Sequence, residues 1–350
     1  MTTIKEIALK ANYSNTTVSR VLNNDQTLSV STEARNKILQ VARELGYKTL
    51  QERKKEQKLS NSAPGKVGIL LCHSVEEELN DAYFLSIRHG IENECEKRGL
   101  NSTEILRIKS FKEEQMSKDI EHLIVVGRIS EEFLNPYKPQ LKTIVYINHS
   151  VDDSLYDSIA IDFEKATKQA LDHLLSLGYR RIGFVGGQER EHLPNGHVDF
   201  EDGRKTTFKQ VLHEQGLFDP DAFYTGEFTM SDGYELMRKA IQKGDLPEAF
   251  FVASDAMAIG AIRALNEQNY RVPEDVAIVS FNDIESAQYT SPPLTTVRVR
   301  TEEMGKLGVK LMLDRLEGRD IPVKVTVPTE LVVRESCGSK QKEKQNKHLA

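Results

Sequence analysis

Helical spacing of apolar residues predicts three short helices in the first fifty positions. Each begins after a hydroxyl residue that can cap a helix N-terminus, Thr3, Ser14 or Ser31, and Glu6 completes a capping box with Thr3. Gly46 marks the end of the third helix. Three residues separate the first two helices, which is the length of the tight turn in a helix-turn-helix unit.

From Lys66 onward, short apolar runs alternate with amphipathic helical segments. Continuous apolar strands that alternate with helices predict a parallel α/β sheet buried on both faces, and the chain has enough strands for two such sheets. Polar loops follow the strand ends, where open α/β sheets bind ligands. The predicted strands are "KVGILLC", "HLIVVG", "KTIVYIN", "SIAIDF", "RRIGFVGG", "AFFVASD" and "DVAIVSF".

Two polar stretches border this α/β region. Residues 48–65 are charged, contain Pro64-Gly65 and have little to bury, so they form a predicted linker. Residues 336–350, "SCGSKQKEKQNKHLA", form a polar tail that we expect to be disordered. The predicted order is therefore a helical head over 1–47, a linker over 48–65, an α/β core over 66–335 and a tail.

Composition is that of an ordinary soluble protein, with 39% hydrophobic and 29% charged residues. No apolar run approaches the roughly 20 residues that a membrane span needs, and the N-terminus has no signal-peptide pattern. Cys72, Cys95 and Cys337 lack the spacing of a metal site, so reduced thiols in a cytoplasmic protein are expected.

The charge is unevenly distributed along the chain. Residues 1–59 contain 11 Lys or Arg and 6 Asp or Glu, a net charge of +5, whereas the whole chain carries −6 and the remainder therefore −11. A basic head on an acidic body favours contact of the head with a polyanion. Basic surfaces that are simply solvated are also common, so the charge alone decides nothing.

The stretch "SNTTVSRVLN" has the chemistry of a recognition helix in the major groove of DNA. Short polar residues at the start of such a helix reach base edges, and here these are Asn15 and Thr16. Side chains suited to phosphate contacts surround them: Ser14, Thr17, Ser19, Arg20 and Asn23. The alternative is a solvated helix face that Ser14 merely caps, but it does not account for the absence of acidic residues.

The head resembles that of the lactose-repressor family of bacterial transcription regulators. The family pattern is matched by Thr3, Glu6, Ile7, Ala8, Ala11, Ser14, Thr17, Val18, Ser19, Arg20, Val21, Leu22 and Asn23, and "ELGYKT" is similar to the family's segment after the third helix. The body also resembles the family, most closely the subgroup of evolved β-galactosidase operon repressors. The resemblance implies DNA contacts by Thr3, Ser14, Asn15, Thr16, Thr17, Ser19, Arg20, Asn23, Tyr47, Arg53 and Lys54.

The linker departs from the family pattern. Family members carry a leucine there that wedges into the minor groove and kinks the operator, whereas this chain has Lys55 or Glu56 in register and Leu59 later. Two interpretations stay open. Either the kink is weaker or shifted to Leu59, or the linker is a basic tether that gains only phosphate contacts.

The resemblance further implies a two-lobed core, with one lobe over 66–162 and 299–318 and the other over 163–298 and 319–335, and a sugar-binding cleft between them. The effector contacts that the resemblance implies are Tyr83, Asn148, Arg204, Phe228, Ser254, Asp255 and Asn282. Asn148 and Asn282 stand where many members carry Asp, and Ser254 stands where Asn is common, so the pocket is less anionic than in those members. Planar bidentate groups and an aromatic platform suit a sugar. Phe228 is equally compatible with an ordinary core position, whereas for Asp255 a helix N-cap is the favoured interpretation over a ligand contact.

The sequence contains no motif for phosphate binding or metal binding. Gly186-Gly187 lies in neither a GxxxxGK[ST] nor a GxGxxG pattern, and the histidines have no metal-ligand spacing; His192 and His197 are expected in a solvated polar loop. The expectation is therefore a repressor without catalytic or metal site or cofactor, which binds double-stranded operator DNA as a homodimer and answers to a small carbohydrate, galactose or a galactoside. The alternatives are a transport solute-binding protein, which would lack the head, and a regulator that needs a protein corepressor.

Overall fold

The computed structural model describes residues 3–23, 25, 28–47, 66–100, 103–108 and 116–339. The chain divides into two compact units, Met1–Pro64 and Gly65–Ala350. The first unit is called the head and the second the core.

The described residues of the head form three helices, α1 (Ile4–Ala11), α2 (Asn15–Leu22) and α3 (Thr32–Glu44). Thr3 and Glu6 form the predicted capping box, and the hydroxyls of Ser14 and Ser31 accept hydrogen bonds from the first turns of α2 and α3. The apolar faces meet in one small core: Ile7, Ala8, Ala11, Val18, Val21, Ile38, Val41 and Ala42 are buried together. The sequence pattern predicted this arrangement, and the structure confirms it.

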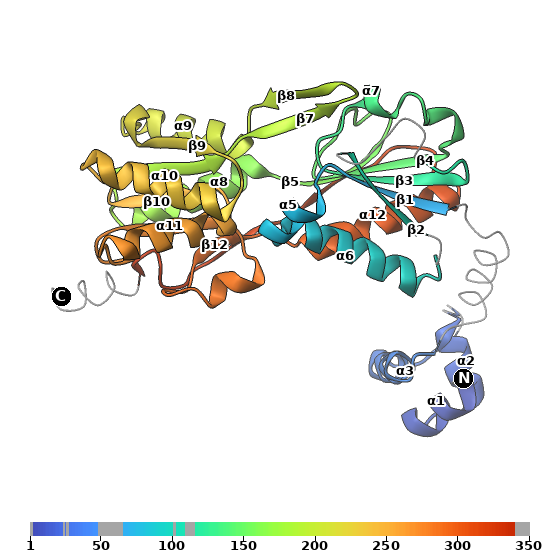
Figure 1. The fold of residues 1–350 in the computed structure, drawn as a ribbon. Helices are drawn as coiled ribbons and strands as arrows, with labels where there is room; N and C mark the ends of the chain where they lie inside the picture. Colours follow the sequence, from blue (N-terminus) through green and yellow to red (C-terminus); the bar gives the residue numbers. More distant parts are fainter. Residues whose placement is uncertain are drawn as a thin grey trace, which may run out of the picture. The chain divides into compact units, whose positions relative to one another are not determined.

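In the part of the core that the structure describes, there are two six-stranded sheets, each with helices packed on it (Figure 1). The sheet of the first lobe is parallel throughout, in the order β13-β5-β4-β3-β1-β2. Its helices α6 and α12 pack against each other and on the sheet. The elements of this lobe are β1 (Lys66–Leu71), α5 (Val75–Asn80), α6 (Ala82–Lys97), β2 (Thr103–Arg107), β3 (Ile120–Val126), α7 (Glu131–Leu134), η2 (Lys138–Gln140), β4 (Thr143–Ile147), β5 (Asp157–Ile161), α12 (Thr301–Leu316) and β13 (Lys324–Val327).

The sheet of the second lobe has the order β14-β12-β11-β10-β6-β9, and only its edge strand β14 is antiparallel. Helices α8 and α9 pack together, as do α10 and α11. The elements are α8 (Phe163–Ser176), β6 (Ile182–Gly187), α9 (Gly203–Glu214), η3 (Pro220–Ala222), β9 (Phe223–Gly226), α10 (Met230–Lys243), β10 (Ala249–Val252), α11 (Asp255–Glu267), β11 (Ala277–Asn282), η4 (Glu285–Gln288), β12 (Thr295–Arg298) and β14 (Glu330–Val332).

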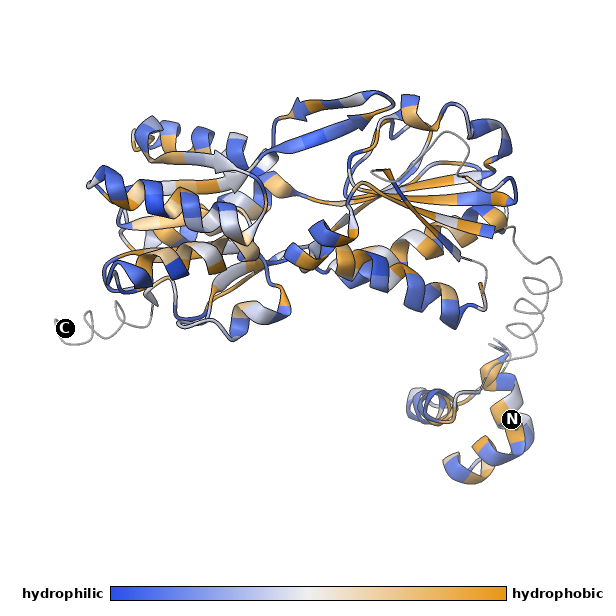
Figure 2. Cartoon of the chain, viewed as in Figure 1, coloured by the Kyte–Doolittle hydropathy of each residue, from blue (hydrophilic) through white to orange (hydrophobic). Residues whose placement is uncertain are grey.

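A separate two-stranded hairpin, β7 (Glu189–Leu193) and β8 (Gly196–Phe200), follows β6. Figure 1 shows this hairpin reaching from the second lobe to the first. In Figure 2 the strands of both large sheets are mostly hydrophobic, and the outer faces of the helices are mostly hydrophilic. The predicted fold class, a helical head with a two-lobed parallel α/β core, is confirmed. No helix within the described ranges is long and apolar enough to cross a bilayer.

Two predicted boundaries are wrong: the assignment of residues 319–335 to the second lobe, and the start of a disordered tail at residue 336. Residues 319–335 were assigned to the second lobe, but β13 pairs with β5 in the first lobe. Burial of Asp157 explains this position, because its carboxylate accepts hydrogen bonds from Arg319 at 2.7 Å and from the amide of Val323 at 2.7 Å. The chain therefore returns to the second lobe only at β14.

The start of the predicted disordered tail is ordered. Ser336 is fully buried, and its hydroxyl donates to the carbonyl of Ile278 and accepts from the amide of Thr295. Cys337 is also buried, and its carbonyl accepts a hydrogen bond from the hydroxyl of Tyr179. These contacts satisfy polar groups beside β11 and β12, so the ordered chain extends at least to residue 339. Residues 340–350 lie outside the described part.

Candidate DNA-binding and effector sites

The start of α2 presents the side chains that the sequence assigned to base contacts. Asn15 and Thr16 are exposed, whereas Val18 and Val21 on the opposite face are buried. The hydroxyl of Ser14 lies 2.9 Å from that of Thr17 and caps the helix. The polar edge and the apolar anchor of α2 are thus on different faces, as a groove-binding helix requires.

Arg20 extends from the end of the same helix and is held in place by a neighbour. Its Nε donates to Asp25 at 2.7 Å, while 41% of the Arg20 side chain stays exposed. Asn23 turns its amide back to the carbonyl of Ser19, and Thr3 is committed to capping α1. Tyr47 packs against the apolar core of the head. The predicted contacts Arg53 and Lys54, and the hinge position Leu59, lie outside the described residues.

A central cavity of about 350 Å³ lies between the two lobes of the core. Six of the seven residues assigned to effector contacts line it: Tyr83, Asn148, Arg204, Phe228, Ser254 and Asn282. They come from α6 and the end of β4 (Asn148 follows Ile147) in the first lobe, and from α9, β11 and the segments beside β9 and β10 in the second lobe. Strand ends of two sheets face each other there, which is where α/β folds bind ligands.

Arg204 is buried at the cavity and held by two carboxylates. Its guanidinium donates to Asp202 at 2.7–3.0 Å, to Glu189 at 3.2 Å and to the carbonyl of Ala253 at 2.8 Å. It also lies over the rings of Phe163 and Phe228, at 5.1 and 4.8 Å. Burial acts to lower the pKa of Arg204, but the two carboxylates hold it above its ordinary value. Because so many of its donors are used, Arg204 has little left for bidentate contact with a ligand.

Tyr83 and Asn148 form a hydrogen-bonded pair in the wall of the first lobe. The hydroxyl of Tyr83 donates to the side-chain oxygen of Asn148 at 2.7 Å. Burial raises the pKa of Tyr83, so the hydroxyl stays protonated. The Asn148 amide then keeps its NH₂ group for other partners.

Asn148 directly follows β4 in the first lobe, and Asn282 is the last residue of β11 in the second; their φ angles are positive, 67° and 115°. Asparagine adopts such backbone conformations more readily than most residues. The side-chain oxygen of Asn282 is buried without a hydrogen-bond partner among the described residues. A buried acceptor that faces a cavity and lacks a partner is what a ligand hydroxyl can satisfy.

Phe228 lies directly on the backbone of β6. A Cβ atom at Gly187 would lie 2.3 Å from the Phe228 ring, so only glycine leaves room for this contact. Phe228 is half-buried, packs on the apolar core of the second lobe and also lines the cavity. It therefore fits both interpretations of its role, an aromatic wall and an outer core residue.

Asp255 is the predicted effector residue that does not line the cavity, and it is not an N-cap either. The N-cap of α11 is Ser254, whose hydroxyl accepts from the amide of Met257. Asp255 is fully buried and accepts hydrogen bonds from Ser280 at 2.5 Å, Thr296 at 2.7 Å and the amide of Ile284 at 2.8 Å. Burial raises its pKa to about 7 against the effect of these bonds. Asp255 thus ties α11 to β11 and β12.

Several cavity residues were missed from the sequence. Arg128, Phe163, Gln188 and Glu189 line the cavity, and none of them belongs to a recognisable short motif. His192 and His197 were expected in a solvated loop, but they lie opposite each other on β7 and β8 and line the cavity. The Asn195-Gly196 dipeptide at the turn is a known hairpin signal and would have predicted these strands.

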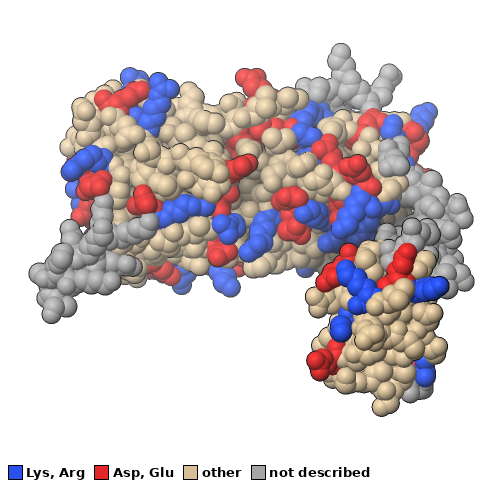
Figure 3. All heavy atoms as spheres, turned by 90° about the horizontal axis from the view of Figure 1, so that it is seen from below, with Lys and Arg blue, Asp and Glu red and all other residues tan. Residues whose placement is uncertain are grey.

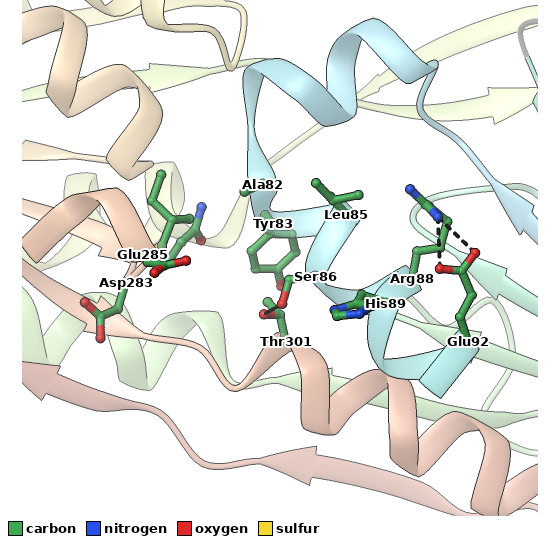
Figure 4. A pocket seen from close by; sticks show the side chains of 12 residues that line it. Ala82, Tyr83, Leu85, Ser86, Arg88, His89, Glu92, Asp283, Glu285 and Thr301 are labelled. Carbon is green, nitrogen blue, oxygen red and sulfur yellow. Dashed lines mark hydrogen bonds and ion pairs between the residues drawn. The ribbon is translucent and has the colours of Figure 1, made fainter. Parts of the chain in front are cut away.

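A second pocket of about 450 Å³ lies beside the central cavity. Figure 4 shows its wall on α6, where Ser86 points toward Thr301 and Arg88 toward Glu92. Tyr83 and Asn282 line both spaces. Arg88, the arginine of this pocket, is already paired with Glu78 and Glu92. The pocket therefore offers a ligand less unpaired positive charge.

Metal and surface chemistry add no further site. No group of three or more His, Cys, Asp or Glu in the described ranges is arranged to hold a metal ion. On the face of the core that Figure 3 shows, Lys and Arg alternate with Asp and Glu and form no extended patch of one sign. This mixed surface contrasts with the acid-poor helix α2 of the head.

Comparison with known proteins identifies the chain. Residues 3–49 match the model described as bacterial regulatory proteins, lacI family, and residues 171–337 match the periplasmic binding protein-like domain. The HTH-type transcriptional repressor MelR of Bacillus subtilis (strain 168) is 49% identical over 98% of this chain and 99% of its own length. The chain belongs to the lacI family. The HTH-type transcriptional regulator GalR of Lacticaseibacillus casei is 36% identical, over 96% of this chain and 99% of its own length.

Solved lacI-family structures have the same fold. A complex of the transcriptional regulator CelR with cellobiose has a TM-score of 0.64 at 26% identity, covering 96% of this chain and 100% of its own. A lac repressor dimer bound to operator and the anti-inducer ONPF also has a TM-score of 0.64, at 23% identity over 96% and 99%. The chain is therefore a helix-turn-helix transcription regulator and not an enzyme, and the family match of the head excludes a solute-binding protein for transport.

Proposed function

We propose that this lacI-family chain is a cytoplasmic repressor that binds operator DNA as a homodimer under the control of a small carbohydrate, galactose or a galactoside. The observation that carries the carbohydrate is the central cavity, in which amides and hydroxyls from both lobes lie beside an aromatic ring. Amide and hydroxyl groups can donate and accept, which suits sugar hydroxyls, and an aromatic face suits the C–H face of a pyranose. The similarity to a CelR–cellobiose complex supports the same ligand class.

The cavity residues have distinct roles in this proposal. Asn148 and Asn282 bind sugar hydroxyls from opposite lobes, because they lie at the ends of strands of the two sheets. Ser254 lies beside them and Phe228 stacks on the sugar. Arg204 positions the cavity wall through Asp202 and Glu189, since most of its donors are committed there.

The head supplies DNA recognition. Asn15 and Thr16 contact base edges, while Ser14, Thr17, Ser19, Arg20 and Asn23 contact phosphates. Two heads of a homodimer read two half-sites of a near-palindrome. A sugar controls this binding only if its affinity differs between the DNA-bound and the free arrangement of the lobes.

Operator selection from a random duplex pool, followed by DNA-binding assays with and without sugars, tests this function. We expect a near-palindromic site and a change of affinity with galactose or a galactoside. Phe228→Ala should reduce the sugar response and leave operator affinity in the absence of sugar unchanged. Tyr289→Ala is the control, because this aromatic side chain is 75% exposed and does not line the cavity. A protein that prefers no duplex over random DNA contradicts the DNA-binding part, and one indifferent to every sugar contradicts the effector part.

A further inference from the structure

The hairpin β7–β8 has two chemically different faces. Its register places His192 opposite His197 and Arg190 opposite Asp199, whereas Glu189 lies opposite Phe200 and Glu191 opposite Val198. Cross-strand partners share a face, and successive residues alternate between faces. Arg190, His192, His197 and Asp199 therefore form one face, called the polar face, and Glu189, Glu191, Val198 and Phe200 form the other, called the docking face.

The docking face holds the hairpin against the first lobe. Arg128 donates to Glu189 at 2.7 Å and lies 3.6 Å from the centre of the Phe200 ring. Nε2 of His149 lies 3.5 Å from Glu191. The backbone adds two hydrogen bonds, from the amide of Ser130 to the carbonyl of His192 and from the amide of His192 to the carbonyl of Arg128. The hairpin is thus a fixed part of the wall between the lobes.

The polar face borders the central cavity. Arg190, His192 and His197 all line it, together with Glu189 at the start of the docking face. Arg190 donates to both oxygens of Glu227, at 2.7 and 2.5 Å, and so links the hairpin to the residue before Phe228. The imidazoles of His192 and His197 add planar groups that donate or accept hydrogen bonds. The cavity therefore has a second set of polar groups beyond the strand-end residues Asn148, Ser254 and Asn282.

We propose that the polar face of β7–β8 is an outer subsite for a second sugar unit, so that the effector is a disaccharide or larger galactoside. This inference rests on the proposed carbohydrate control. The strand-end residues bind the terminal sugar, and His192 and His197 bind hydroxyls of the next unit. Because the docking face fixes the hairpin to the first lobe, a sugar bound at both subsites contacts groups tied to both lobes. A monosaccharide bound at the strand-end residues leaves the outer subsite unoccupied.

Calorimetric titration of the full chain with galactose, lactose and melibiose tests the subsite, because the two disaccharides carry a terminal galactose in different linkages. We expect at least one disaccharide to bind about tenfold or more tightly than galactose. His197→Ala should remove most of that advantage, because it should weaken disaccharide binding much more than galactose binding, and His192→Ala should act in the same direction. Val198→Ala is the matched control, because Val198 neighbours His197 in sequence but lies on the docking face.

The outcomes separate the two proposals. Galactose that binds as tightly as both disaccharides overturns the outer subsite and leaves sugar control intact. A His197→Ala variant that loses affinity equally for galactose and the disaccharide also overturns it, because the effect then is not local to a second unit. If neither galactose nor a disaccharide binds, the proposed galactoside control fails, and the subsite fails with it. The unfolding temperature of each variant is measured as a control for folding. His197→Ala should unfold at the wild-type temperature, because the His197 side chain is exposed.

Discussion

Arg128 of the first lobe and Glu189 of the hairpin that follows β6 form an ion pair of 2.7 Å in the wall of the central cavity. The other carboxylate oxygen of Glu189 accepts a hydrogen bond from Arg204 at 3.2 Å. One carboxylate therefore joins the contact between the lobes to the buried arginine of the cavity wall. A change that moves Arg204 therefore acts on the same carboxylate that holds Arg128.

Glu189→Ala should destabilise the core and weaken the response to sugar. The side chains of Arg128 and Glu189 are each 18% exposed. The free energy of unfolding should therefore fall by about 2 kcal/mol, a loss between that of a surface ion pair and that of a buried one. Urea unfolding of the variant measures it. Asp199→Ala removes a carboxylate that is 70% exposed on the same hairpin and should cost much less. Equal losses in both variants would show that the bridge contributes nothing specific.

Asn282 allows its backbone and side-chain roles to be separated. Asn282→Ala places a residue that disfavours positive φ at an angle of 115°, whereas Asn282→Gly removes the same amide without that strain. The glycine variant should be the more stable by about 1 kcal/mol, and both should lose sugar affinity to the same extent. Thermal unfolding and calorimetry measure the two quantities. If the glycine variant retains wild-type sugar affinity, the asparagine is there for its backbone alone.

The sequence predicted the parts of this protein that follow from local patterns. Capping residues and apolar spacing predicted α1, α2 and α3, because a short helix is specified by its own caps and by one apolar face. Apolar runs predicted the central strands such as β1, β3 and β10 for the same local reason. Strand β13 was assigned to the wrong lobe, since its pairing with β5 joins residues far apart in the sequence.

The cavity was only partly predictable. Asn148, Arg204, Phe228, Ser254 and Asn282 were found by carrying family positions over, and Tyr83 from its place after the first strand; all six line it. Arg128 and Glu189 were not found, because their significance is a contact between two lobes that no spacing encodes. The ion pair between Arg204 and Asp202 was not predicted either, although the two residues are close in sequence, because it depends on the burial of both side chains.

Gly187→Ala should reduce sugar affinity without affecting the head. The new Cβ would lie 2.3 Å from the Phe228 ring, so the ring must leave the cavity wall. We expect a loss of about tenfold in sugar affinity, the size of one displaced aromatic contact, and unchanged operator affinity in the absence of sugar. Gly216→Ala is a control for a glycine substitution, since nothing lies within 4 Å of its added Cβ, although its positive φ lowers stability. Unchanged sugar binding by Gly187→Ala would remove Phe228 from the site.

His149 should make the stability of the core depend on pH. Burial and then the charge of Arg128 lower its pKa from 6.5 to about 4. Nδ1 accepts from Arg128 at 3.0 Å, so the imidazole is neutral with its proton on Nε2. The stability that this neutral histidine contributes is fully present above pH 6.5 and is lost as the pH falls toward 4, by on the order of 3 kcal/mol. Urea unfolding between pH 7 and 4 should show a shallower decline for His149→Gln than for the wild type.

The head allows phosphate contacts to be distinguished from base contacts. Arg20 is half exposed and oriented by Asp25, so Arg20→Ala should weaken binding to every duplex and reduce the salt dependence by about one phosphate contact. Asn15→Ala should instead cost about 1–3 kcal/mol on the preferred site and relax the preference at one base pair. Arg263→Ala removes an equally charged but 75% exposed side chain of the core and should change neither property. If Asn15→Ala keeps the wild-type sequence preference while Arg20→Ala alters it, the assignment of base and phosphate contacts within α2 is reversed, because only base-edge contacts distinguish one sequence from another.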